Sequence, residues 1–201
     1  MLSSKSNVVS GDEAVIKSQS MNESLNGRTI LITGAAKRVG KIFASACARA
    51  GADVVIHHAH SDEEAEIVRA EIAGLGHKAW VFKADLNDSS RAQSLIPRIN
   101  ESAPLHGFVN SAAIFQSLSL ENTSLEDWEK HLAIDLTAPF LLSQAFAKQA
   151  QEGAWIVNIL DWRLVRSCPY RMAKPNQTLQ RIFPQDDERR KMKLSKHFFL
   201  Y

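Results

Sequence analysis

The sequence predicts an α/β fold in which one parallel sheet lies between two layers of helices. Five short apolar runs rich in β-branched residues recur between residues 28 and 160, and stretches with helical periodicity separate them. A turn with two glycines connects the first run to an alanine-rich helical stretch. The 201 residues, 45% of them hydrophobic, leave room for one sizeable core. Strands that alternate with helices form parallel βαβ units, so we expect the strand order 3-2-1-4-5, with a ligand at the carboxyl ends of the strands.

The first strand and the first helix enclose the most informative turn of the chain. Residues 28–32 predict a buried strand and residues 41–50 a helix, and residues 33–40 connect them. Gly34 allows the backbone to turn tightly, and Gly40 allows the helix to pack close to the strand. The amides exposed at the start of the helix then face a pyrophosphate. Strand, glycine turn and helix in this order predict a dinucleotide site.

The later elements continue the alternation. Apolar and β-branched runs predict strands at residues 53–57, 78–83, 106–110 and 153–160. Helical periodicity predicts helices at residues 62–75, 89–101 and 124–151. We expect Pro97 to interrupt the second of these helices and Pro139 to break or kink the third, because proline lacks a backbone donor and clashes with the preceding turn.

Composition divides the chain into three expected parts. The N-terminal residues are rich in Ser, Asn and Lys with little to bury, so residues 1–26 predict a disordered extension, with Met21 as an alternative start. Residues 27–166 predict the nucleotide-binding domain, and residues 167–201 a divergent, polar and basic tail. The first twenty residues lack the apolar core of a secretory signal, and no apolar run approaches the length that crosses a bilayer.

Charge and cysteine content exclude several function classes. The net charge of +2 is too small to indicate binding to nucleic acid or to a membrane surface. Cys47 and Cys168 form no disulfide framework, and no metal-ligand spacing surrounds them or the scattered histidines. We therefore expect a cytoplasmic protein without a metal site, whose partner is a small molecule.

Four motifs in order carry a resemblance to a known family. They are the turn at residues 33–40, Asp85-Leu86 after the third strand, the run 110–113 after the fourth and the run 158–161 after the fifth. The segment from about Gly27 to Arg166 resembles the short-chain dehydrogenase/reductase family, most closely its pteridine reductase branch, in which Arg stands at the place of Arg38 instead of a middle Gly. The resemblance implies a Rossmann-like three-layer sandwich and a nicotinamide cofactor.

The charge around the second strand's end favours NADPH over NADH. The run from His57 to Ser61 contains no carboxylate, and the glycine turn supplies Lys37 and Arg38. An acid there would bond the ribose 2′-hydroxyl of NAD, whereas a 2′-phosphate prefers charge-assisted donors. His60 falls where the branch often has Arg, and it is only partly charged at neutral pH, which makes the preference milder. The alternative is that Lys37 and Arg38 are solvated loop cations without a ligand.

The resemblance also implies the remaining cofactor contacts. Asp85 and Leu86 would touch the adenine, and Asn110 would hold the end of the fourth strand beside the nicotinamide ribose. The full set of expected cofactor-binding residues is Gly34, Lys37, Arg38, Val39, Gly40, His57, His60, Ser61, Asp85, Leu86, Asn110, Ser111 and Ala112.

The family's catalytic pattern has counterparts after the fifth strand. The branch places an Asp where other members have Ser, followed by Tyr and Lys in the spacing Tyr-x-x-x-Lys, and Asp161, Tyr170 and Lys174 match these positions. The resemblance implies that the Tyr donates a proton while the Lys holds the ribose and lowers the Tyr pKa. Two departures stand against this assignment. Asp161 lies nearer to Tyr170 than is usual, and Pro175 follows Lys174 directly, which disfavours a helix there. A chance match of Tyr170 and Lys174 is the alternative.

Two function classes remain open at this point. The first is an NADPH-dependent reductase of a dihydropterin or a similar small carbonyl or imine substrate. The second is a non-catalytic nucleotide-binding remnant or an inactive fragment, because residues 176–201 show no sixth-strand pattern and predict a truncated or frame-altered member. The family is homo-oligomeric, and the elements that would form its dimer are missing from the expected fold.

A third departure from the family pattern is Asp135, where the family usually has the Asn of a proton relay.

Overall fold

The structure is a computed structural model that describes residues 25–116 and 118–160. Its five strands are β1 (Thr29–Ile32), β2 (Asp53–His58), β3 (Ala79–Lys83), β4 (Gly107–Asn110) and β5 (Trp155–Asn158). All neighbouring strands pair in parallel, in the order β3-β2-β1-β4-β5. The predicted α/β architecture and strand order are therefore confirmed.

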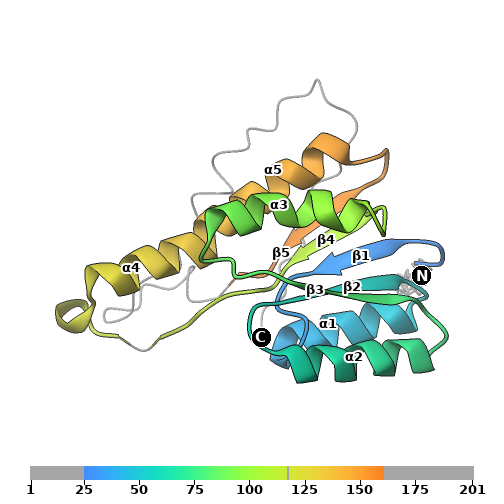
Figure 1. The fold of residues 1–201 in the computed structure, drawn as a ribbon, viewed down its shortest axis with the longest axis horizontal. Coiled ribbons are helices and arrows are strands. Elements are labelled where there is room, and N and C mark those ends of the chain that lie inside the picture. Colours follow the sequence, from blue (N-terminus) through green and yellow to red (C-terminus); the bar gives the residue numbers. More distant parts are fainter. Residues whose placement is uncertain (1–24, 117, 161–201) are drawn as a thin grey trace, which may run out of the picture.

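Helices cover both faces of the sheet (Figure 1). On one face lie α1 (Arg38–Arg49) and α2 (Asp62–Gly74), and on the other lie α3 (Ser89–Asn100) and α5 (Ala138–Gln149). The short helix η1 (Leu120–Asn122) precedes α4 (Leu125–Leu132), and the π-helical segment η2 (Ala133–Thr137) joins α4 to α5. Among the described helices, none is long and apolar enough to cross a membrane.

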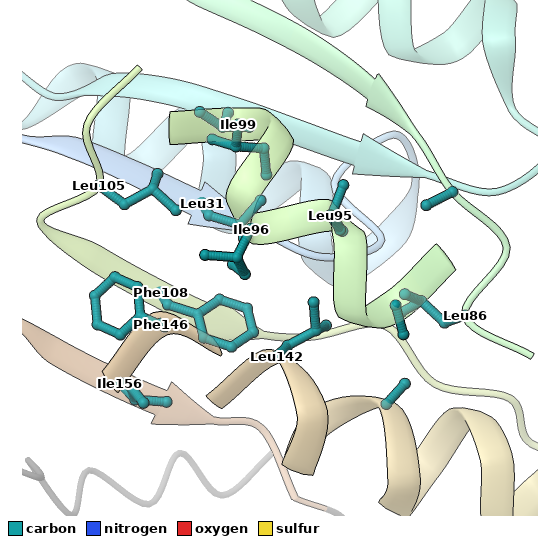
Figure 2. Close-up of a cluster of buried hydrophobic side chains, with 14 of the residues drawn as sticks. Leu31, Leu86, Leu95, Ile96, Ile99, Leu105, Phe108, Leu142, Phe146 and Ile156 are labelled. Carbon is teal, nitrogen blue, oxygen red and sulfur yellow. The ribbon is translucent and has the colours of Figure 1, made fainter. Parts of the chain in front are cut away.

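Alternation along the central strands divides the core into two layers. In β1, Ile30 and Ile32 pack with the α1 and α2 residues, whereas Leu31 packs with those of α3 and α5. Successive side chains of a strand point to opposite faces, so this one strand contributes to both layers. Figure 2 shows the second layer, where the rings of Phe108 and Phe146 lie 6.0 Å apart between the sheet and α5. The two layers fix the helices against the sheet and hold the strand ends in place.

Pro97 does not interrupt its helix, so that expectation was wrong. It stands inside α3, which continues to Asn100. The missing donor removes one helical hydrogen bond near the end of the helix. Leu95, Ile96 and Ile99 are fully buried in the core, and their packing holds the last turn in place.

The interruption expected at Pro139 is a π-helical segment rather than a sharp break. The helical run from Leu125 to Gln149 is continuous, with η2 immediately before α5. Pro139 lies in the first turn of α5, and η2 accommodates the missing backbone donor there. At the other end of the run, Ser124 and Asp127 form a capping box that starts α4.

Two further boundaries differ from the expected ones. Helix α1 begins at Arg38 rather than at residue 41, so three residues assigned to the turn belong to the helix. The packed domain already includes Leu25, whose N–H donates to the Ala50 carbonyl at 2.8 Å and whose side chain contacts the core. Leu25 and Asn26, which were expected to belong to the N-terminal extension, are thus among the described residues, and Leu25 packs with the domain. The expected boundary between residues 166 and 167 lies outside the described residues.

Candidate functional site

A cleft of about 630 Å³ opens at the carboxyl ends of the strands. Five of its wall segments lie at or after the ends of the five strands, and Lys130 of α4 and Ile134 of η2 complete the lining. The five segments are residues 34–40 after β1, 57–61 at the end of β2, 85–87 after β3, 111–115 after β4 and 159–160 after β5. The strand order reverses between β1 and β4, and ligands of open α/β sheets bind at such a switch point.

The glycine turn forms the floor of this cleft. Gly34 has a φ of +68°, and a Cβ on it would lie 3.0 Å from the Ala112 Cα. A Cβ on Gly40 would collide with the Gly34 carbonyl. Both positions therefore require glycine. Gly34 has a left-handed backbone, and at both glycines the neighbouring atoms leave no space for a Cβ. The turn ends at Lys37, and the free amides of the first turn of α1 follow it.

Arg38 adopts the backbone conformation of a glycine. Its φ is +53°, and no other described residue except glycine has a positive φ. Such a conformation costs a residue with a Cβ roughly 1–2 kcal/mol. The exposed guanidinium lines the cleft and forms no ion pair or hydrogen bond with the described residues. A strained backbone under an unpaired cation at a cleft is typical of a binding position.

His57 lies beneath the turn and is 1% exposed. Its Nδ1 accepts a hydrogen bond from the Gly34 N–H at 3.3 Å, and its Nε2 donates to the Ala84 carbonyl at 3.0 Å. Burial lowers the pKa of His57 from 6.5 to about 4. The ring is therefore neutral at neutral pH, with its proton on Nε2.

Burial affects the charge of the histidines at the end of β2. His58 is also buried and its pKa is lowered, mainly by burial, and its Nδ1 accepts from the Ser61 N–H at 3.2 Å. Only His60 is exposed, with its Nε2 3.9 Å from a carboxylate oxygen of Asp85. Two of the three histidines thus add no positive charge near neutral pH, because both are buried. The cations that remain on this side of the cleft are Lys37 and Arg38.

Thr33 and Asn110 fix the loop on the opposite wall. The Thr33 Oγ1 accepts hydrogen bonds from the N–H groups of Ser111 and Ala112, both at 3.0 Å. The Asn110 Nδ2 donates to the Asn158 Oδ1 at 2.8 Å and ties β4 to β5 at the cleft. Asn110 is 5% exposed and lies beneath the cleft wall rather than on it. The twelve other residues expected to contact the cofactor all line the cleft.

The comparison with protein families decides the identity of this fold. The family model described as short chain dehydrogenase matches residues 28–161. This chain belongs to the short-chain dehydrogenase family. The resemblance inferred from the four motifs is confirmed at that level.

Individual relatives of the family cover most of the described chain. L-rhamnose 1-dehydrogenase (NAD(P)(+)) of Sphingomonas sp. is 32% identical over 126 residues, which are 62% of this chain and 50% of that protein. The crystal structure of a short chain dehydrogenase from Burkholderia cenocepacia in complex with NADP has a TM-score of 0.71 at 32% identity, covering 73% of this chain and 60% of that one. FolM alternative dihydrofolate reductase 1 from Brucella suis, also in complex with NADP, has a TM-score of 0.66 at 29% identity, covering 77% and 64%. This chain therefore spans only 50% to 64% of the length of these three family members.

Asp135 connects the helical layer of this family member to the cleft loop. It lies in the π-helical segment η2 and is 1% exposed. Its Oδ1 accepts the Ile114 N–H at 3.0 Å, which fixes the loop that lines the cleft after β4. An Asn would make the same contact through its side-chain oxygen, so this bond does not depend on the charge of Asp135.

Sequence reasoning missed several wall residues of the cleft. Lys130 and Ile134 lie in the helical run, and the rest come from loops or from the end of β2. Four missed residues lie inside the motif runs, namely Ala36, His58, Ala59 and Ala113, and those outside the runs are Asn87, Ile114, Phe115, Lys130, Ile134, Ile159 and Leu160. The spacing of four places Lys130 and Ile134 on one side of a helix, and only the packed structure shows that this side faces the cleft.

The expected catalytic residues lie outside the described part of the chain. Asp161, Tyr170 and Lys174 all follow Leu160, the last described residue, which itself lines the cleft. Within residues 25–116 and 118–160, no group of three or more His, Cys, Asp or Glu side chains has the geometry of a metal site.

Proposed function

We propose that this chain is an NADPH-dependent oxidoreductase that reduces a dihydropterin or a similar small carbonyl or imine compound. The observation that carries the proposal is Arg38, which lines the cleft and whose guanidinium has no partner among the described residues. The end of β2 beside it, residues 57–61, has no carboxylate. A 2′-phosphate is the cofactor group that such a cation fits, through charge-assisted hydrogen bonds.

The described residues fit a dinucleotide along the whole cleft. Gly34 and Gly40 let the turn pack closely against its neighbours, and the amides of the first turn of α1, which follow the turn, would hold the pyrophosphate. Asp85 and Leu86 would hold the adenine, and Ser111 and Ala112 the nicotinamide side. The B. cenocepacia and B. suis proteins described above are complexes with NADP, which supports the same cofactor here.

The proposed chemistry joins this cleft to the residues after β5. Bound NADPH supplies a hydride to an electrophilic carbon of the substrate. Tyr170 donates the proton that neutralises the product, Lys174 holds the ribose, and Asp161 assists protonation of a ring nitrogen. The similarity to an alternative dihydrofolate reductase supports a pterin-like substrate.

A nucleotide-binding protein without turnover is the second candidate. Two features of the sequence favour it: the short interval between Asp161 and Tyr170, and Pro175 directly after Lys174. Both would displace the catalytic groups, and a displacement of about 1 Å can cost a hundredfold in rate.

One experiment separates the two candidates. NADPH and NADH are titrated by fluorescence, and NADPH oxidation is followed with dihydropterin and dihydrofolate.

The three outcomes of this experiment are distinct. Tighter NADPH binding with turnover supports the reductase. Tighter NADPH binding without turnover supports the second candidate. Equal or reversed affinities contradict the assignment of the cofactor.

A further inference from the structure

His57 is in contact with two other segments at the cleft, the glycine turn and the residues that follow β3. Its ring bonds the Gly34 N–H and the Ala84 carbonyl, and its own carbonyl accepts the Ala35 N–H at 3.0 Å. Gly34 and Ala35 open the glycine turn, and Ala84 immediately precedes the Asp85-Leu86 pair. One buried residue thus links the pyrophosphate side of the cleft to the adenine side.

The ring bonds require one protonation state. Nδ1 accepts only when it carries no proton, and Nε2 donates only when it carries one. Burial keeps the pKa of His57 near 4, so this tautomer is the stable form at neutral pH. The charged or titratable groups that affect the pKa of the His57 ring are His58 on the same strand, which lowers it, and Asp85 after β3, which raises it.

We infer that His57 is a positioning residue for dinucleotide binding, whose imidazole holds the glycine turn in register with the adenine wall. The inference rests on the proposed function, because it assumes that the turn binds a pyrophosphate. The Gly34 N–H is partly buried, and the loss of its acceptor makes the native turn less favourable, so the turn shifts. The amides of α1, which follow the turn, then shift away from the ligand. His57 itself touches neither the phosphate nor the reacting atoms, so it acts through the turn.

Two substitutions separate the two ring bonds. In His57→Asn, the side-chain oxygen lies near the position of Nδ1, so the acceptor for the Gly34 N–H is kept while the donor to Ala84 is lost. In His57→Gln, the longer amide reaches the position of Nε2, so the donor to Ala84 is kept while the Gly34 N–H loses its acceptor. Both variants are neutral and polar, which makes them a matched pair for the full chain.

The test is the affinity of each folded variant for NADPH at pH 7, with folding checked by circular dichroism. We expect His57→Asn to bind within about threefold of the unsubstituted chain and His57→Gln to bind roughly tenfold or more weakly. A residue that only fills space would lower the melting temperature in both variants and leave the affinity of the folded protein unchanged. Equal affinities of folded His57→Gln and the unsubstituted chain would overturn the inference.

Failure of the inference and failure of the proposed function give different results. If the unsubstituted chain binds neither NADPH nor NADH, the proposed function is wrong and the inference falls with it. If the unsubstituted chain binds and the two variants weaken binding alike, only the inference is wrong. If His57→Gln does not fold, His57→Asn decides alone, and a tenfold loss of affinity in that variant overturns the inference.

Discussion

The Nζ atom of Lys37, a residue that lines the cleft, lies 2.8 Å from a carboxylate oxygen of Glu64 in α2. The pair joins the last residue of the glycine turn to the first turn of α2, and it lowers the pKa of the Glu64 carboxyl. Glu64 therefore competes with any 2′-phosphate for the Lys37 ammonium, and its charge repels that phosphate.

Replacing Glu64 should strengthen the binding of NADPH selectively. In Glu64→Gln the ammonium of Lys37 is released and one negative charge is removed, so we expect the NADPH affinity to rise roughly two- to fivefold, the range for an exposed ion pair. The NADH affinity should stay unchanged, because NADH has no 2′-phosphate. Fluorescence titration with both cofactors measures this.

Glu63→Gln is the matched control for this prediction. It removes the same charge from the neighbouring exposed position of α2, away from the ion pair with Lys37. An equal gain in both variants would show a general charge effect rather than the release of Lys37. The gain should also disappear in high salt, which screens exposed charges.

Gly107 in β4 should tolerate no side chain. A Cβ there would lie 2.5 Å from the Trp155 ring and 2.9 Å from the Ile30 Cδ1, in a sheet without space to adjust. We expect Gly107→Ala to lower the free energy of unfolding by about 1–3 kcal/mol, measured by urea denaturation. Gly74→Ala is the control, because a Cβ at Gly74 meets nothing within 4 Å at the end of α2, and it should be neutral or stabilising by up to about 1 kcal/mol. Similar destabilisation by both changes would contradict the packing argument.

The fold was predictable because its signals are local and repeat along the chain. Apolar periods of two and of 3.6 residues separate strands from helices, and Gly34 and Gly40 mark the turn that places the ligand. Pro97 shows the limit of local rules, since tertiary packing of the neighbouring leucine and isoleucines outweighs one lost hydrogen bond.

Site residues were predictable where the order of strands along the chain determines their position. They were not predictable where tertiary packing determines it. Segments after parallel strands must meet at one edge of the sheet, so the glycine turn, Asp85 and Ser111 were assigned to one cleft. The protonation of His57 and His58 depends on burial by residues distant in sequence, which no local pattern reports. Lys130 was missed for the same reason, because its position at the cleft depends on how α4 packs.

Burial of His57 should make the protein less stable in mild acid. The unfolded chain takes up a proton near pH 6.5, whereas the folded chain resists protonation until about pH 4. Above pH 6.5 both states are neutral at this residue, so it adds no pH dependence there. As the pH falls from 6.5 to 4, the unfolded state gains protons first and the free energy of unfolding falls by about 3 kcal/mol.

Comparison with His57→Asn isolates this contribution. Asn does not titrate, so the variant should lose less stability than the unsubstituted chain between pH 7 and pH 4, although its stability at pH 7 is lower. Urea denaturation at several pH values measures the difference between the two slopes. Parallel pH profiles would show that other groups, such as the carboxylates, cause the whole acid effect.

Arg38 combines a backbone effect with a charge effect, and two substitutions separate them. Arg38→Ala removes the guanidinium and keeps the strain of a positive φ, whereas Arg38→Gly removes both. We expect both variants to lose NADPH affinity by about 1.5–3 kcal/mol, the value of a charge-assisted hydrogen bond, and to bind NADH almost as before. Arg38→Gly should in addition be more stable than Arg38→Ala by about 1 kcal/mol, because glycine adopts the left-handed backbone without a steric cost.

The two measurements on the Arg38 variants have separate meanings. If Arg38→Ala binds NADPH as tightly as the unsubstituted chain, the cation is a solvated loop residue and does not hold a 2′-phosphate. If both variants lose NADH and NADPH binding equally, Arg38 acts on the shape of the turn rather than on the phosphate. A lower melting temperature for Arg38→Gly than for Arg38→Ala would contradict the strained backbone at this position. The combination we expect, a shared loss of NADPH affinity with a stability gain only for glycine, means that backbone strain at the turn is retained for the sake of a positive charge at the cleft.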